Sequence, residues 1–309
     1  MLELLTHPVV SGLLVMGVVG VLAHKAHFVD ISGLVSAFAV GFTVWYTGGP
    51  PAFSILLFFF LSSGVATKFK YKAKAKDGLA QEGKGRRSYR NVLASGFIPM
   101  IFSIGWFIAR EYPALGIPAF WMFGGFVGAA ATTAADTLAS EIGVFSKSKP
   151  RLITNLRRKV PRGTIGAVSL LGEVMAAVAG LAIGTIAVVF ALISSGTGWG
   201  SVPVSNLAEL LFIIPLAVLT AFIGCNLDSL IGAVAQNRFV CEICGAITDK
   251  EFHCEYETKY VGGFKRFTNV HVNLGSSTLG ASLGIVLGAG LFVWILGALF
   301  FWIAASSSS

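Results

Sequence analysis

Residues 117–143 have the sequence IPAFWMFGGFVGAAATTAADTLASEIG, in which a long run of apolar and small side chains ends in two acids. The apolar part, 117–135, is close to the ~20 residues that a helix needs to cross the hydrocarbon core of a bilayer. Asp136 follows directly, among alanine, threonine and serine residues that permit close helix packing. The segment therefore predicts a transmembrane helix that ends in a functional carboxylate.

The rest of the chain has the same apolar character. Of its 309 residues, 55% are hydrophobic and only 12% are charged, whereas soluble domains carry roughly 25% charged residues. This composition excludes a water-soluble domain, and the 25 phenylalanines exclude a disordered chain because they supply ample apolar surface to bury. We expect one all-α membrane domain, residues 1–309, built as a polytopic helix bundle.

Apolar runs predict about eight transmembrane helices. The turn Gly48-Gly49-Pro50-Pro51 separates the second run from the third, and both are short enough that a re-entrant hairpin is the alternative to two full spans. The sixth and eighth runs are long enough to be tilted or broken. The predicted spans are 8–24, 31–47, 51–66, 92–109, 117–135, 165–194, 207–224 and 275–304.

Lysine and arginine are concentrated in three connections between these spans, which hold nine, seven and five of the 23 basic residues. Lys25 falls on the same side, and Arg110 alone falls on the other. The positive-inside rule therefore predicts that these connections form a basic cytoplasmic face and that both termini are non-cytoplasmic. We expect a multi-pass protein of a cell membrane or an organelle envelope. The three loops span 67–91, 144–163 and 237–270.

Two acids on different predicted helices, Asp136 and Asp228, lie near this basic face. A carboxylate inside a bilayer costs about 2.5–3.5 kcal/mol on insertion scales, so each needs a function or a partner. Thr132, Asp136 and Ser140 share one helix face. Two carboxylates beside basic loops suit Mg²⁺ with a polyphosphate; the alternative is that each acid caps a helix or pairs with an arginine. Glu173, in the predicted sixth span, is a further candidate for a functional acid, and a salt bridge within the bundle explains it equally well.

The second basic loop, SKSKPRLITNLRRKVPRGTIG (146–166), predicts an anion site. Arg158, Lys159 and Arg162 offer charged donors, and we expect Gly163-Thr164 to begin a helix whose free backbone N–H groups also face the anion. The order of these residues is not that of a Walker A motif. In the first loop, GKGRRSYRN (83–91) could also wrap phosphates, whereas the run at 68–76 favours a solvated or headgroup-contacting loop.

The third loop contains Cys241 and Cys244 at C-x2-C spacing, followed by His253 and Cys254. Two interpretations remain open: these four residues hold a structural Zn²⁺, or the cysteines are reduced cytosolic thiols. Cys225 falls within a span and is expected to be a small buried side chain.

The motifs DTLASEIG (136–143), PRLIT (150–154), KVPRGTIGAVS (159–169), LDSLIGA (227–233) and NVHVN (269–273) occur in this order. They resemble the integral membrane family of transmembrane protein 19, also called domain of unknown function 92, which includes the plant phytyl-phosphate kinase of tocopherol synthesis. The resemblance runs from about 83 to 285. The layout is more distantly similar to CTP-using membrane enzymes: dolichol kinase, phytol kinase and the CDP-diacylglycerol synthases.

The resemblance implies a CTP-dependent, Mg²⁺-requiring transfer of phosphate to a polyprenyl monophosphate. It implies Asp136 and Asp228 as Mg²⁺ ligands, with Glu141 as a further member of the catalytic group. Two larger sets follow from it. The implied nucleotide and phosphate contacts are Asn91, Arg158, Lys159, Arg162, Gly163 and Thr164. The implied acceptor-positioning residues are Ser140, Asn269 and Asn273.

The sequence thus predicts a phosphotransferase, a CTP:polyprenyl-phosphate kinase that makes phytyl or geranylgeranyl diphosphate at the cytoplasmic face. Its expected partners are CTP and an isoprenoid phosphate lipid; we expect no nucleic acid, since an apolar, basic chain favours anionic lipids or phosphorylated substrates, and a homodimer is left open. One alternative is a cytidylyltransferase that attaches CMP to a lipid phosphate. Another is a transporter or flippase, although the chain shows no inverted repeat.

Overall fold

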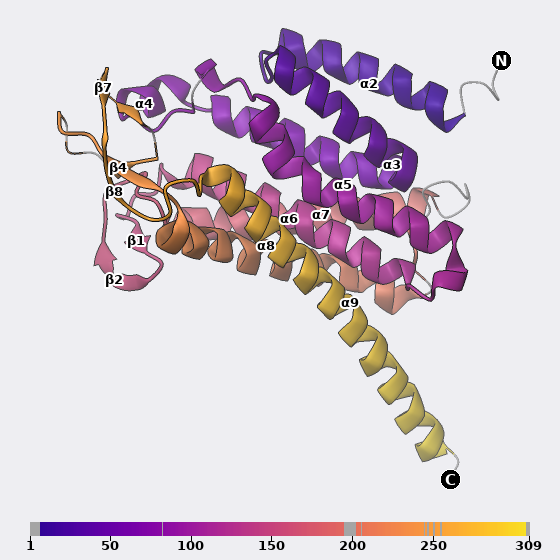
Figure 1. Cartoon of the computed structure of the whole chain (residues 1–309). Coiled ribbons are helices and arrows are strands. Elements are labelled where there is room, and N and C mark those ends of the chain that lie inside the picture. Colours follow the sequence, from indigo (N-terminus) through magenta and orange to yellow (C-terminus); the bar gives the residue numbers. More distant parts are fainter. Residues whose placement is uncertain are drawn as a thin grey trace.

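The computed structural model describes residues 7–81, 83–194, 202–204, 206–243, 245, 247–249, 251–253 and 255–306, with the side chains of all of these except Ser194, His253 and 291–306. Long helices run side by side along most of the molecule, and short strands gather at one end of them (Figure 1). The expected all-α membrane architecture is confirmed in the described residues.

By length and composition, six of the described helices can cross a membrane. These are α2 (Pro8–Lys25), α3 (Ile31–Lys68), α5 (Tyr89–Glu111), α7 (Leu170–Ser194), α8 (Leu207–Ala235) and α9 (Asn269–Ser306). A further long helix, α6 (Ala119–Gly143), lies among them. The short elements are α4 (Tyr71–Lys76) and the 3-10 turns η1 (Gly83–Gly85) and η2 (Pro113–Leu115).

Helix α3 is a hairpin of two arms, 31–48 and 50–68. Gly49 adopts φ 65° and ψ −164°, a conformation open to glycine that reverses the chain. The arms then pack on each other, with the rings of Trp45 and Phe53 at 5.3 Å between centroids. The predicted turn is confirmed. With its arms counted separately, the described residues hold eight long helical segments, the number that the apolar runs predict.

Helix α6 occupies the centre of the bundle and contacts α5, α7, α8 and α9. Its contact with α9 is made by glycines on both helices: a β-carbon on Gly128 would overlap the carbonyl oxygen of Gly280, and one on Gly284 would overlap that of Gly124. Glycines four residues apart on each helix let the two backbones touch, as in membrane helix pairs of the small-xxx-small type. The position of α9 therefore depends on the absence of side chains at these sites.

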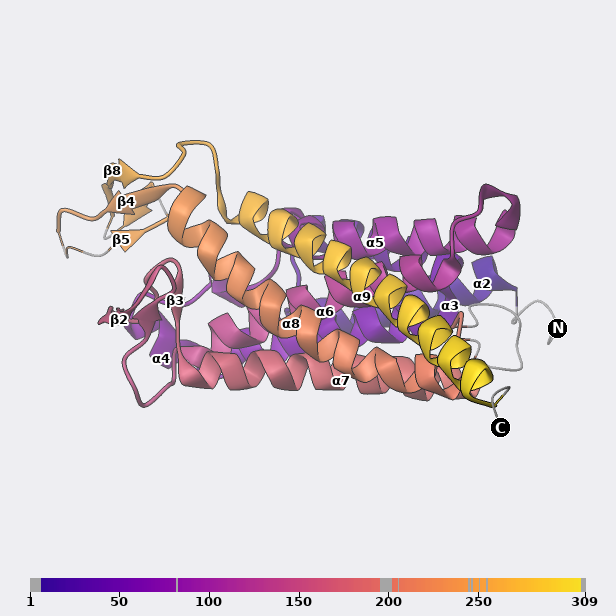
Figure 2. The same cartoon turned by 90° about the horizontal axis from the view of Figure 1, so that it is seen from below.

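The contact of α6 with α8 fixes the register of the two helices. The hydroxyl of Thr132 donates to the carbonyl of Thr220 at 2.9 Å, and a β-carbon on Gly224 would overlap the Thr132 side chain. Both helices end at the strand-bearing end of the molecule, so they run parallel (Figure 2). One turn beyond Thr132 and Gly224, the parallel register therefore places Asp136 beside Asp228.

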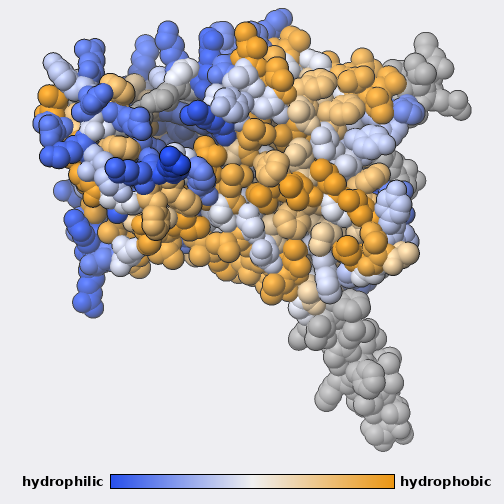
Figure 3. Space-filling view, viewed as in Figure 1, coloured by the Kyte–Doolittle hydropathy of each residue, from blue (hydrophilic) through white to orange (hydrophobic). Residues whose placement is uncertain are grey.

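The second and third connections fold into small antiparallel sheets that the sequence did not predict. The first has the order β2-β1-β3 and the second β5-β4-β8, with a separate β6-β7 hairpin. Their bounds are β1 Arg151–Leu152, β2 Asn155–Lys159, β3 Ala167–Val168, β4 Arg238–Val240, β5 Ile247–Thr248, β6 Phe252–His253, β7 Tyr256–Glu257 and β8 Lys259–Gly262. Figure 3 shows hydrophilic side chains gathered at this end and hydrophobic ones along the rest of the visible face.

Pairing of β3 with β1 also delays the start of α7, which begins at Leu170 rather than at the predicted 165. Ser169 caps the helix, because its hydroxyl accepts from the amide of Gly172 at 3.1 Å and donates to the carbonyl of Gly143 at 3.1 Å. The same serine therefore ties the end of α6 to the beginning of α7.

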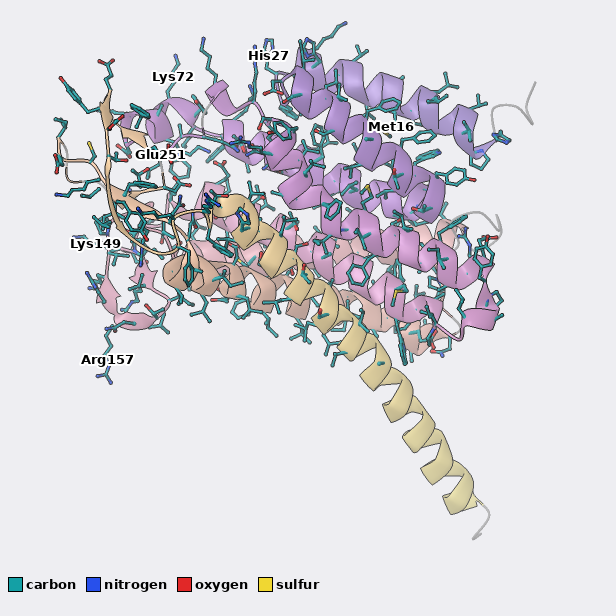
Figure 4. The ribbon with its side chains drawn as sticks, viewed as in Figure 1. Met16, His27, Lys72, Lys149, Arg157 and Glu251 are labelled. Carbon is teal, nitrogen blue, oxygen red and sulfur yellow. The ribbon has the colours of Figure 1, made fainter. Side chains whose placement is uncertain are left out.

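The expectation that the run at 68–76 is a solvated or headgroup-contacting loop is wrong for Lys74. This lysine is 2% exposed and lies on α4, where its ammonium donates to the carbonyls of Ala66 and Thr67 and forms an ion pair with Glu141 of α6. The charge is buried because three oxygens satisfy its three donors. Lys72, on the same short helix, is exposed (Figure 4).

Gly128→Leu should weaken the bundle, because the new side chain must enter the space held by the α9 backbone. Overpacking of this kind costs about 1–3 kcal/mol. We expect a lower melting temperature in detergent for this variant. Gly17→Leu on α2 is the matched control, since a β-carbon there meets nothing within 4 Å. Equal melting temperatures for the two variants would contradict the close α6–α9 contact.

Lys74→Met should leave the Glu141 carboxylate without its cation, and removing one partner of a buried ion pair costs about 3–5 kcal/mol. A lower melting temperature is expected, while Lys72→Met, which changes an exposed lysine in the same way, should leave it unchanged. The double variant Lys74→Met, Glu141→Gln should recover part of the loss because it no longer buries an unpaired charge. If the double variant is no more stable than Lys74→Met alone, the ion pair does not hold α4 in place.

Candidate functional site

A cavity of about 1730 Å³ opens at the strand-bearing end of the bundle. Its walls come from all three basic connections and from the adjoining ends of α5, α6, α8 and α9. Most of the residues that the sequence analysis proposed for a site therefore line this one cavity, and the exceptions are described below.

Asp136 and Asp228 meet in this cavity. Their carboxyl groups are close enough to interact directly with each other. The hydroxyl of Ser276 on α9 donates to Asp228 Oδ1 at 2.7 Å, and Ser140, one turn beyond Asp136 on α6, also lines the cavity. Neither carboxylate forms an ion pair with a described lysine or arginine within 4.0 Å. Two facing acids without a neutralising partner form a site that a cation can fill.

The beginning of α9 adds an amide oxygen to the same region. Asn269 and Asn273 line the cavity, and Oδ1 of Asn273 is buried with no hydrogen-bond partner in the described structure. Ser276, which contacts Asp228, is three residues further along the same helix face. A buried oxygen acceptor left without a donor is costly, and a bound cation would satisfy it.

The fit to Mg²⁺ can be judged from these donors. Mg²⁺ takes oxygen ligands, commonly one or two carboxylates completed by water and substrate phosphate. Asp136, Asp228 and the orphaned amide oxygen of Asn273 supply such a set, and the cavity leaves room for the remaining ligands. The residues present therefore fit this ion.

The second connection brings Arg158, Arg162 and Thr164 to the cavity wall. Arg162 is held in place because its Nη2 donates to the carbonyl of Ser146 at 2.7 Å, and Thr164 Oγ1 donates to the carbonyl of Pro161 at 2.8 Å. Lys159 lies on the exposed strand β2 and is not among the residues that line the cavity. Of the phosphate contacts predicted in this loop, Lys159 is thus the one that does not line the cavity.

The expected helix start at Gly163-Thr164 is wrong. Gly163 has φ 79° and lies in a turn between β2 and β3, several residues before α7 begins at Leu170. No helix N-terminus faces an anion here, because residues 167–168 pair with β1 instead of entering the helix. A β-carbon on Gly163 would overlap Leu79, so this turn packs directly on the first connection.

The first connection contributes Asn91 and also Arg87, which the sequence analysis included only as part of the segment 83–91. Arg87 is 6% exposed, and its Nε has no hydrogen-bond partner in the described part of the chain. Burial lowers the pKa of Arg87 to about 10, an effect partly offset by the charges of Glu141 and Asp136. Its guanidinium lies 5.7 Å from the ring centre of Phe59. Only its place in the tertiary structure distinguishes it from the exposed Arg86.

The other two acids that the sequence analysis considered, Glu141 and Glu173, have partners. Glu141 pairs with Lys74 and accepts from the hydroxyl of Thr67 at 3.0 Å. Glu173 accepts from Asn226 Nδ2 at 2.9 Å. Both residues line the cavity, but their carboxylates are already committed. The structure therefore gives Glu141 a role in anchoring α4 to α6.

The third connection contributes Asp249, Glu251 and Phe252 to the lining of the cavity, none of which the sequence analysis proposed. Cys241 is buried. Cys244, Cys254 and the side chain of His253 lie outside the described residues, and so does the hypothesis of a zinc site. Among the described residues, no three or more histidine, cysteine, aspartate or glutamate side chains form a metal-binding group.

Comparison with known proteins gives the same picture of an integral membrane protein. The family model described as "Integral membrane protein DUF92" matches residues 14–281. Protein PGR of Arabidopsis thaliana is 29% identical over 235 residues, which cover 74% of this chain and 79% of that protein. An uncharacterized membrane protein of Synechocystis is 31% identical over 203 residues, or 66% of this chain and 70% of that protein.

Protein VTE6 of Arabidopsis thaliana, a chloroplastic protein, is 30% identical over 260 residues, which cover 83% of this chain and 64% of that protein. No solved structure shows a significant match. The matched region includes the first and second connections and the ends of α6, α8 and α9 that bear Asp136, Asp228 and Asn273. On this match, the chain belongs to the DUF92 family of integral membrane proteins.

Proposed function

We propose that this protein is a membrane kinase that transfers the terminal phosphoryl group of CTP to an isoprenyl monophosphate. The observation that carries the proposal is the meeting of Asp136 and Asp228 in an open cavity walled by basic connections. The similarity to VTE6 relates the chain to a chloroplastic protein, and the motifs described above resemble the family of the phytyl-phosphate kinase. The activity itself is our inference.

In the reaction, an oxygen of the lipid phosphate forms a bond to the γ-phosphorus of CTP, and the bond from that phosphorus to the β–γ bridging oxygen breaks. The products are a prenyl diphosphate and CDP. Phosphoryl transfer asks little covalent chemistry of the protein, so catalysis consists of alignment and charge stabilisation. A cavity with facing acids and convergent arginines is suited to these two tasks.

Asp136, Asp228 and Asn273 would hold Mg²⁺. The bound ion would supply neutralisation of phosphate charge and alignment of the reacting oxygens. Ser276 keeps the Asp228 carboxylate oriented through its hydrogen bond. This division into ligands and supporting donors is typical of metal sites, in which the outer hydrogen bonds fix the ligand geometry.

Arg158 and Arg162 would contact the phosphates of the nucleotide, with Thr164 and the turn at Gly163 beside them. Guanidinium groups bind phosphate through paired N–H donors. Because the cavity opens at the polar end of the bundle, the nucleotide can enter from water. We further propose that this end is cytoplasmic and that both termini are on the opposite side, on the distribution of basic residues.

The proposal is tested with purified protein, labelled CTP, Mg²⁺ and phytyl or geranylgeranyl monophosphate. We expect CDP and the prenyl diphosphate in equal amounts, and no turnover once Mg²⁺ is chelated. Release of pyrophosphate with a CMP-lipid product would identify a cytidylyltransferase instead. Prenyl phosphate flux across proteoliposomes without nucleotide turnover would identify a transporter, and either result would refute the kinase.

Asp136→Asn and Asp228→Asn should each reduce kcat by at least 100-fold, because one charge of the cation site is removed, while the melting temperature stays close to that of the unaltered protein. Glu111→Gln is the matched control, since its side chain is exposed near the other end of α5. Unchanged turnover in either aspartate variant would remove that residue from the site.

A further inference from the structure

Arg87 borders two separate cavities. One is the polar cavity that contains Asp136 and Asp228, and the other is a small apolar cavity of about 80 Å³ between α2, α3 and α5. Ser95 on α5 also lines both. The buried guanidinium of Arg87 therefore lies at the boundary between the polar cavity and the apolar one.

The apolar cavity is a groove on the flank of the bundle. Met16 and Gly20 of α2 line one side, and Ser95 and Gly96 of α5 line another. Both arms of the α3 hairpin line the groove between them, from Leu34 to Gly41 and from Phe53 to Phe60. Each of the two α3 segments spans about 10 Å of helix at 1.5 Å per residue. Phe38 is 39% exposed at the rim, so the groove opens on the hydrophobic side of the bundle rather than ending in a closed core. Met16 lies against α3 inside the bundle (Figure 4).

The charge at the inner end of this groove lacks a direct partner. Arg87 Nε is buried without a hydrogen bond, and no carboxylate of the described residues lies within 4.0 Å of the guanidinium. Its backbone, in contrast, is fully engaged: the amide donates to the carbonyl of Phe28, and the carbonyl accepts from the amide of Asp30. Placing a charge in such surroundings is unfavourable unless an anion binds it. The backbone bonds hold the residue in position, which leaves the side chain available for that anion.

We propose that this groove binds the hydrocarbon chain of the acceptor lipid and that Arg87 binds its phosphate, presenting it to the Asp136–Asp228 pair. The inference rests on the proposed function in taking a lipid phosphate as the acceptor. The occupant follows from the two cavities: an apolar ligand without charge would leave Arg87 unpaired, and a free phosphate or nucleotide would leave the groove empty. A prenyl phosphate meets both requirements, because its chain lies in the groove and its phosphate binds Arg87.

The arrangement also separates the routes of the two substrates. The lipid enters sideways between α2, α3 and α5, whereas the nucleotide enters the polar cavity beside Arg158 and Arg162 of the second connection. Because the groove follows only about 10 Å of helix, the first isoprene units are held by the protein and the remainder of a long chain extends into the bilayer. Acceptors of different length should therefore share the contacts near Arg87.

The binding site is tested without nucleotide. Purified protein is irradiated with farnesyl monophosphate that carries a diazirine on its second isoprene unit, and the modified residues are mapped by mass spectrometry. We expect labels on α2, α3 and α5 around Met16, Gly41 and Phe53. Labels confined to α7, α8 or α9 would overturn the inference. Farnesol with the same diazirine should label the groove at least 10-fold less efficiently.

Two variant pairs test the two halves of the proposal. Arg87→Gln should weaken binding of the farnesyl phosphate probe by at least 10-fold, and Arg157→Gln, on the exposed strand β2 and pointing away from the bundle (Figure 4), should not. Ala37→Phe should block the groove and reduce labelling, whereas Ala39→Phe, exposed on the same helix and outside the groove, should not. If Arg87→Gln does not fold, Arg87→Lys retains the charge without the planar fork and should weaken binding to a lesser extent.

The outcomes distinguish this inference from the proposed function. Groove labelling in a protein that does not consume CTP would retain the lipid site and refute the kinase. CTP-dependent formation of prenyl diphosphate with labels outside the groove would retain the kinase and refute the lipid site. Equal binding by Arg87→Gln and the unaltered protein would remove Arg87 from phosphate recognition.

Discussion

Backbone-to-backbone contact around α6 is the constraint on which the rest of the structure depends. Gly128 and Gly280 bring α9 against one side of α6, and Gly224 admits the Thr132 side chain between α6 and α8. In a bilayer, helices gain little from burying apolar surface, so small residues and interhelical hydrogen bonds decide how they associate. Because α6 and α8 are parallel, the Thr132–Gly224 contact fixes the height of everything one turn beyond it. The pairing of Asp136 with Asp228 is a consequence of that register.

The polar end of the bundle combines two kinds of charge that differ in their partners. Lys74 and Glu141 form a closed pair that fastens the first connection to α6. Asp136, Asp228 and Arg87 lack such direct partners in the described structure. A buried charge is unfavourable unless another group compensates it. We therefore infer that the Lys74–Glu141 pair stabilises the fold, whereas Asp136, Asp228 and Arg87 are available to bind ligands. The second and third connections, which fold into small sheets, supply further walls of the same cavity.

Much of the architecture follows from local features of the sequence. Length and hydropathy of the apolar runs predict the helices, and Gly49 with its following prolines predicts the hairpin in α3, since only glycine tolerates the backbone angles required there. The alternation of basic loops predicts one polar end. Local features did not predict the burial of Lys74, because its neighbours in the sequence are exposed lysines of the same kind. They also predicted a helix start at Gly163-Thr164, where the chain instead leads into β3, which pairs with β1. Short strands with exposed faces leave no periodic pattern to detect.

By itself, the sequence determined that the chain lies in a membrane and that acids stand at the ends of two helices beside basic loops, because these properties depend on composition and on spacing along one helix. Only the tertiary structure decided which charges meet. Arg86 and Arg87 are adjacent and chemically identical, yet one is exposed and the other is buried between a polar cavity and an apolar groove. Burial and proximity arise from segments far apart in the chain, and no local pattern encodes the distance between them.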